Sequence, residues 1–236
     1  GEEQVYEFMR FMTMSAGDFL DEYFENDLVK ALYSTSSIIG TALGVYSPGT
    51  AYVLLHHVMG DVDGAVGAWG LARGGMGAIS NALAGALKEH DGEILTEAPV
   101  AQIIIKNGCA KGVALEDGRE INADIVVSNL DPKRTFTNIM DAADIPSDLR
   151  KKAENFKIRG SSGKVNIALT GKPDFPSLPA DHKLRNGSFQ FLDSMERMER
   201  AYDDWKHGRW SDDPFIEMTQ SSVWDPTLAS PGHYFV

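Results

Sequence analysis

The segment from Arg73 to Pro132 constrains the fold of this chain most, because it carries an unbroken series of local structure signals. A glycine turn at 73–77 leads into a helical period of apolar residues. Two strand-like runs then flank Asn107-Gly108, a strong signal for a two-residue hairpin turn. The continuous apolar run Ile125–Val127 follows, and it is typical of a strand buried on both faces. That predicted strand stops at a small polar pair, Ser128-Asn129.

This order of elements suits the nucleotide-holding part of a flavin or nicotinamide enzyme. Gly75-x-Gly77 opens the helix after a short strand-like run at 68–72, and Glu97 lies at the end of the next predicted strand. In a dinucleotide fingerprint, glycines let the pyrophosphate approach a helix N-terminus and a later acid binds the ribose. Here Ser80 occupies the third glycine position, so the match is partial. A glycine turn that only lets a helix end pack closely is the alternative.

The parts before and after this segment mix helices and strands without strict alternation, which predicts an α+β fold. Ser15 is the expected cap of a second helix within the helical region 3–32. Further segments are predicted from their apolar periods: helices at 51–59, 136–140, 146–156 and 196–206, strands at 164–169 and 215–219, and a glycine-rich loop at 60–67.

Composition excludes several classes of partner. The formal charge of −12 repels nucleic acid and anionic lipid. No apolar run approaches the roughly 20 residues of a membrane span, and the first residues lack the pattern of a signal peptide. Cys109 is the only cysteine, so an intrachain disulfide is excluded and a reducing compartment is expected. We predict the cytoplasm, with the mitochondrial matrix as the alternative in a eukaryote.

Other candidate sites are weaker. The phosphate-loop-like run 160–164 has the wrong spacing and leads into a strand, and 61–64 lacks the later positions of a calcium loop. His56 and His57 are adjacent, so on a helix they cannot chelate one metal together. Cys109 lies between Lys106 and Lys111. It is either a modestly reactive thiol or an incidental exposed cysteine. We predict no metal site, and the catalytic residues stay unassigned.

Several segments together resemble the phytoene-desaturase-like flavoprotein amine oxidoreductases, and in particular the branch of pyridine nucleotide-disulphide oxidoreductase domain-containing protein 2. The resemblance covers nearly the whole chain. The segments that carry it are Ser47–His57, Arg73–Gly77, Ala123–Asn129, Asp131–Phe136, Lys164–Leu169 and Ala201–Asp204. It implies FAD as cofactor and hydride transfer from an apolar or amine-like small molecule to the flavin.

The resemblance also implies a division of the chain. Residues 1–72 would be a helical segment of the substrate region. Residues 73–132 would be the return of the chain into the FAD domain, and 133–236 a truncated part of the substrate domain. Since the chain begins without Met and ends in the apolar run GHYFV, we expect a central portion of a longer protein. Alone it would bind FAD weakly or not at all and be inactive.

The resemblance assigns cofactor contacts to six residues. Val100 would offer its backbone to the adenine, and Ser128 and Asn129 would lie near the dinucleotide. Gly74, Gly75 and Gly77 would pack a helix N-terminus close to the cofactor domain. The alternative function is a non-catalytic interaction module that has lost flavin. Association into a homo-oligomer stays open, because unpaired strand edges favour pairing between chains.

Overall fold

The computed structural model describes residues 1–160, 162–179 and 182–236, and it divides the chain into two compact units. Unit 1 comprises Gly1–Ala82 and Gly160–Val236, and unit 2 comprises Leu83–Arg159. The helices of unit 1 are α1 (Glu2–Thr13), α2 (Ala16–Tyr23), α3 (Asp27–Ser34), η1 (Thr35–Ser37), α4 (Thr50–Val58), η3 (Lys183–Asn186), α8 (Met195–Lys206), α9 (Ser221–Trp224) and η4 (Pro226–Leu228). Helix α5 (Met76–Glu89) crosses the boundary between the two units.

Local capping explains where the first helices begin. The Ser15 hydroxyl accepts a hydrogen bond from the Asp18 amide at 3.0 Å and donates to the Asp18 carboxylate at 2.6 Å. The Asn26 side chain accepts from the amides of Leu28 and Val29 at the start of α3. These bonds satisfy amides that a helix leaves free at its N-terminus. The predicted helical region 3–32 and the Ser15 cap are confirmed.

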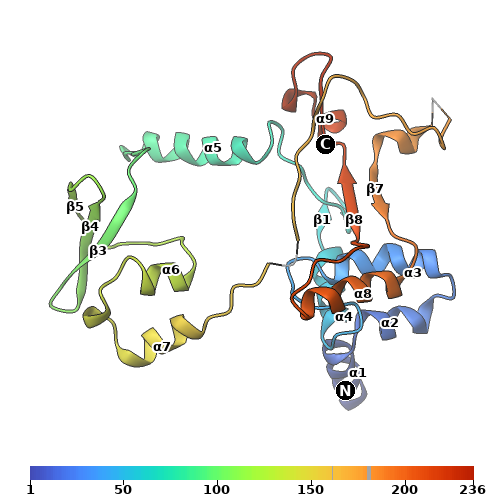
Figure 1. Cartoon of the computed structure of the whole chain (residues 1–236), viewed down its shortest axis with the longest axis horizontal. Coiled ribbons are helices and arrows are strands. Elements are labelled where there is room, and N and C mark those ends of the chain that lie inside the picture. The colour runs from blue at the N-terminus through green and yellow to red at the C-terminus, as the bar shows by residue number, and fades with distance from the viewer. Residues whose placement is uncertain (161, 180–181) are drawn as a thin grey trace. The chain divides into compact units, whose positions relative to one another are not determined.

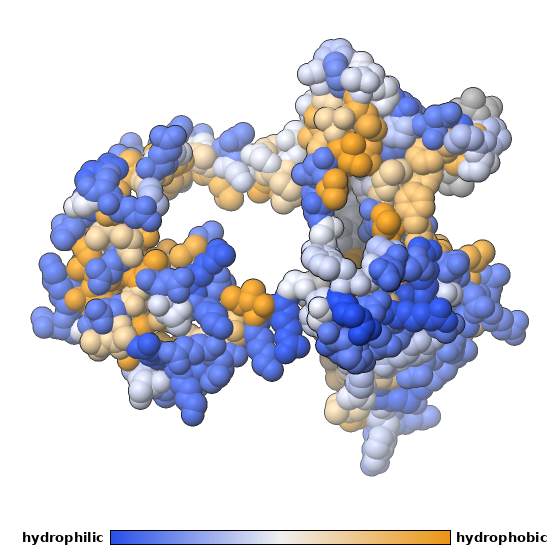
Figure 2. Space-filling view, viewed as in Figure 1, coloured by the Kyte–Doolittle hydropathy of each residue, from blue (hydrophilic) through white to orange (hydrophobic). Residues whose placement is uncertain are grey.

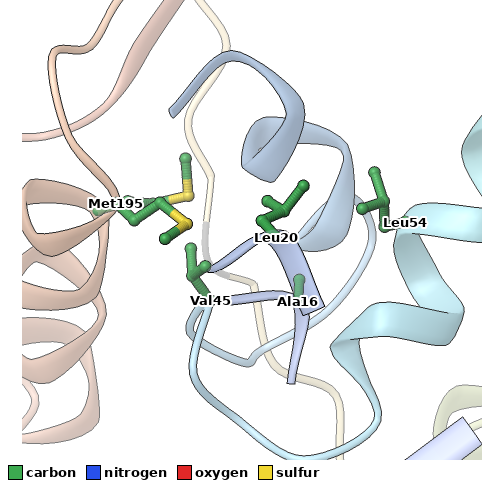
Figure 3. Packing of buried hydrophobic residues seen from close by; sticks show 6 residues of the cluster. Ala16, Leu20, Val45, Leu54 and Met195 are labelled. Atoms are coloured by element: carbon green, nitrogen blue, oxygen red, sulfur yellow. The ribbon is translucent and has the colours of Figure 1, made fainter. Parts of the chain in front are cut away.

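The core of unit 1 lies where α8 meets the N-terminal helices. Its buried members come from α2, the loop before α4, α4 itself and α8: Ala16, Leu20, Val45, Leu54, Met195 and Met198. Figure 3 shows Leu20 between Val45 and Met195 on one side and Leu54 on the other. Helix α8, predicted at 196–206, therefore folds back onto a segment about 150 residues earlier in the chain.

The sheets of unit 1 are small and antiparallel. Strands β1 (Asp61–Val62) and β2 (Ala65–Val66) form a hairpin where we predicted only a loop. The other pairs are β6 (Ala168–Leu169) with β9 (Tyr234–Phe235), and β7 (Ser188–Phe191) with β8 (Ile216–Thr219). Figure 1 shows β7 and β8 beside each other. The strand predicted at 215–219 is confirmed, whereas the one at 164–169 is limited to the two residues of β6.

Unit 2 is built around a three-stranded antiparallel sheet in the order β3–β4–β5. Its strands are β3 (Val100–Lys106), β4 (Cys109–Leu115) and β5 (Glu120–Asn122), followed by α6 (Pro132–Thr137), η2 (Ala142–Asp144) and α7 (Ser147–Asn155). Asn107 and Gly108 both have positive φ, 53° and 72°, as a type I′ turn requires. The predicted hairpin and the helix at 146–156 are confirmed, and the helix predicted at 136–140 instead begins at Pro132.

Three predicted strands are wrong, and the one expected at Ile94-Leu95 before Glu97 is irregular. Residues 125–127 form no strand, and two of the three side chains are exposed, Ile125 at 79% and Val127 at 87%. A strand needs a neighbour for its amides and carbonyls, and no described strand pairs with this run. Residues 68–72 are also irregular, since Gly70 interrupts the run and it too has no pairing partner in the described chain. The α+β fold class itself is confirmed by the mixture of elements.

Candidate functional site

The glycine turn before α5 is held by a residue far away in the sequence. Gly74 and Gly75 have φ of 85° and 75°. Residues with a Cβ atom rarely adopt such positive φ values, whereas glycine adopts them freely. The Gly74 amide donates a hydrogen bond of 2.6 Å to the carboxylate Oδ2 of Asp225. A side chain at Gly75 would meet Leu228 Cδ2 at 3.0 Å. The turn therefore lies directly against the segment 225–228.

Asp225 organises that segment through its other oxygen. Its Oδ1 accepts hydrogen bonds from the Thr227 amide at 3.0 Å and from the Thr227 hydroxyl at 2.6 Å. These bonds cap the short helix η4, in which Pro226 is the first residue. The Thr227 hydroxyl above all, then the Gly74 amide and the nearby charge of Arg73, lower the pKa of the Asp225 carboxyl. The sequence analysis did not single out Asp225, although Asp225-Pro226 has the same pattern as Asp131-Pro132, where the Asp131 side chain caps α6.

An open hollow of about 510 Å³ lies at this junction within unit 1. The residues that line it are Leu71, Ala72, Arg73, Trp224, Asp225, Pro226 and Thr227. Leu71 is 67% exposed and Trp224 is 46% exposed, so apolar side chains are accessible there. Figure 2 shows apolar side chains gathered over α9 and the C-terminal strand of this unit. The hollow combines apolar surface, one cation and one hydrogen-bonded carboxylate.

The residues before the glycine turn are attached to α4 through His57 and Trp69. The His57 ring stacks on the Trp69 ring at 5.9 Å between centroids, and Trp69 Nε1 donates to the His57 carbonyl at 3.2 Å. His57 Nδ1 lies 2.8 Å from the Val53 carbonyl. His57 thus has a structural role. Among the described side chains, no group of three or more His, Cys, Asp or Glu is arranged to hold a metal ion.

The remaining predicted cofactor contacts lie in unit 2. Val100 begins the edge strand β3, is 37% exposed, and is followed by an irregularity in its pairing with β4. The Ser128 hydroxyl lies 2.9 Å from the Thr135 hydroxyl and accepts from the Leu130 amide at 3.3 Å. Asn129 is exposed. The cofactor roles of these three residues and of Gly74, Gly75 and Gly77 stay predictions.

The glycine turn does not fit a pyrophosphate. The Gly74 amide already donates to the Asp225 carboxylate, which would repel a second anion. The run 68–72 directly before the turn is not a strand, and Glu97 lies in a loop rather than at a strand end. In unit 2, an exposed edge strand at Val100 and the exposed amide of Asn129 suit contact with one part of a dinucleotide. The predicted role of these unit 2 residues is therefore contact with one part of a flavin cofactor. The phosphate-loop-like run 160–164 includes residue 161, which lies outside the described residues.

Comparisons with known proteins now decide the family. Residues 5–221 match the model of the flavin containing amine oxidoreductases. The chain belongs to this family. It is 33% identical over 240 residues to pyridine nucleotide-disulfide oxidoreductase domain-containing protein 2 of Mus musculus, covering 99% of this chain and 41% of that protein. The predicted family is confirmed, and the family implies a flavin cofactor.

Carotenoid enzymes are among the other relatives. The chain is 26% identical to chloroplastic prolycopene isomerase 2 of an Oncidium hybrid cultivar, over 95% of this chain and 35% of that protein. An oxidoreductase of known structure from Methanosarcina mazei has a TM-score of 0.51 at 19% identity, covering 89% of this chain and 46% of that one. A protein of known structure from Pyrococcus furiosus has a TM-score of 0.53 at 18% identity, covering 94% of this chain and 48% of that one. The chain therefore spans less than half the length of these relatives.

The described helices include no membrane span. The longest, α5, has 14 residues, and no helix combines the length and apolar content needed to cross a bilayer.

Proposed function

We propose that this chain is the central portion of an FAD-dependent oxidoreductase that removes a hydride from an apolar or amine-like small molecule. The observation that carries the proposal is the family match across residues 5–221. The similarity to a prolycopene isomerase and to a 4,4'-diapophytoene desaturase of a Methylomonas species favours an apolar, unsaturated substrate over an amine. The single exposed cysteine, Cys109, supports a reducing compartment such as the cytoplasm.

The parts of the chain would then divide the work. Residues 73–132 would return to the flavin domain and give the adenine a backbone partner at Val100. The segments 1–72 and 133–236 would shape the substrate region, and the parts of them that lie in unit 1 share one core at α2, α4 and α8. The flavin supplies the two-electron chemistry when it is bound. This chain would supply orientation and exclude water, which explains why no strong acid or base pair stands out.

The whole protein tests this proposal. We expect it to purify with a flavin absorbance band, and FAD to be released on denaturation. Under anaerobic conditions, a conjugated or partly saturated polyene should bleach the flavin band as it loses a hydride to the flavin and a proton to the medium. A panel of primary and secondary amines should bleach it more slowly. A protein that is colourless and fails to reconstitute with FAD would refute the proposal and favour the non-catalytic interaction module.

A further inference from the structure

We propose that the hollow between the glycine turn and α9 binds the carboxylate end of an elongated unsaturated acid, with Arg73 as the anion-binding residue. The inference rests on the proposed function, since it names a substrate class for the same protein. Its evidence is an open hollow in unit 1 that places the exposed cation of Arg73 beside the exposed side chains of Trp224 and Leu71.

Arg73 is available to a ligand. In the described part of the chain no hydrogen bond or ion pair engages its side chain, and its charge acts on Asp225 only through space. The guanidinium presents a planar set of donors that matches the two oxygens of a carboxylate. Arg73 is one of the residues that line the hollow, and it is exposed. An acid would therefore find a geometric as well as an electrostatic partner.

Asp225 limits the charge of the ligand. Its two carboxylate oxygens already accept three hydrogen bonds, from the Gly74 amide and from the amide and hydroxyl of Thr227. Three of its roughly four acceptor sites are therefore occupied within the protein. Its negative charge also opposes a doubly charged phosphate more than a singly charged carboxylate. The attraction of Arg73 for an anion, opposed by the negative charge of Asp225, favours a ligand with a single negative charge.

The apolar side chains account for the rest of the ligand. Trp224, 46% exposed, offers an aromatic face, and Leu71, 67% exposed, offers aliphatic surface beside it. A conjugated chain buries apolar area against such groups and stacks on the indole. The volume of about 510 Å³ lies within the range of small-molecule sites. The hollow thus has room for one end of a chain and a charged group to fix it.

The test uses parinaric acid, a conjugated tetraene fatty acid, and its methyl ester, with the whole protein. Both quench tryptophan emission by energy transfer when bound. We expect the acid to bind about threefold to fivefold more tightly than the ester, the range for an exposed ion pair. Arg73→Gln should abolish this preference and Arg73→Lys should keep part of it. Arg119→Gln, an exposed arginine of unit 2, is the matched control and should leave it unchanged.

Trp224→Phe separates the location of the site from its charge preference. This variant should reduce energy transfer at saturation while the acid still binds more tightly than the ester. Equal affinities for acid and ester, a preference that survives in Arg73→Gln, or no binding of either probe would overturn the inference. Because the readout is binding, such a result would leave the flavin proposal standing if the protein still carries reducible FAD.

Discussion

Thr50 offers a sharp test of how unit 1 is held together, because one buried hydroxyl joins three segments. Its Oγ1 accepts a hydrogen bond from the Ala16 amide at 2.8 Å and lies 3.0 Å from the Val45 carbonyl and 2.8 Å from the Ser47 carbonyl, to which it can donate. Thr50 is completely buried. We predict that Thr50→Val destabilises the unit more than Thr50→Ser, although valine preserves the shape of threonine.

The magnitude follows from which groups lose their partners. Ala16 is the first residue of α2, so its amide has no partner within the helix. In Thr50→Val this amide stays buried and unpaired, which costs about 2 kcal/mol. The carbonyl of Val45 keeps its bond from the Gly17 amide at 3.1 Å, so it adds little. Thr50→Ser keeps the hydroxyl and loses one methyl group, about 1 kcal/mol.

Urea unfolding followed by tryptophan emission measures this difference selectively. All four tryptophans lie in unit 1, so the signal reports on the unit that contains Thr50. With a slope of about 2 kcal/mol per molar urea, the midpoint should fall by about 1 M for valine and about 0.5 M for serine. A valine variant as stable as the serine variant would refute the assigned role of the hydroxyl.

Three further predictions concern other parts of the chain. Leu20→Ala, at the buried centre of the core, should lower the free energy of unfolding by about 3 kcal/mol in the same urea assay. Leu32→Ala, at an exposed position, should lower it by less than about 0.5 kcal/mol, and similar losses for the two variants would argue against this core. In unit 2, Gly112→Ala should weaken hydrogen-exchange protection of β4 and β5, because Gly112 has φ of 144° and an added Cβ would overlap the Ile121 carbonyl. Gly85→Ala in α5, where the space is open, should leave this protection intact. The hydrogen bonds to Asp225 lower the pKa of its carboxyl. These bonds therefore stabilise the turn fully at pH values above the ordinary aspartate pKa, and the stabilisation is lost as the pH falls through the lowered pKa. The Gly74 amide chemical shift should therefore titrate with a midpoint below about pH 3.9, the ordinary value for an aspartate, and an amide shift that does not titrate would contradict the Gly74–Asp225 bond.

Local signals in the sequence predicted the local parts of the fold. The Ser15 cap, the Asn107-Gly108 turn and the period of α8 each depend on a few neighbouring residues, and all three are confirmed. The bond between Gly74 and Asp225 joins residues 151 positions apart, so no local pattern indicates it. The run 125–127 has the composition of a buried strand but no described partner, and pairing is a property of two segments rather than one.

The Arg73–Pro132 segment first resembles an incomplete dinucleotide fingerprint. The Asp225 carboxylate at the Gly74 amide explains why that interpretation fails, since the position of the pyrophosphate already faces an anion. The glycines instead let the start of α5 approach Leu228. The sequence thus singled out the glycine turn, whereas it gave no sign of the carboxylate that holds it, Asp225.

Titration with FAD tests the central claim most directly. The chain of 236 residues and the whole protein would be titrated in parallel, with protein-bound flavin measured by absorbance and by quenching of flavin emission. We predict stoichiometric FAD in the whole protein and weak or undetectable binding by the chain, because its glycine turn offers no free pyrophosphate site. Tight, saturable binding of FAD by the chain alone would contradict this account.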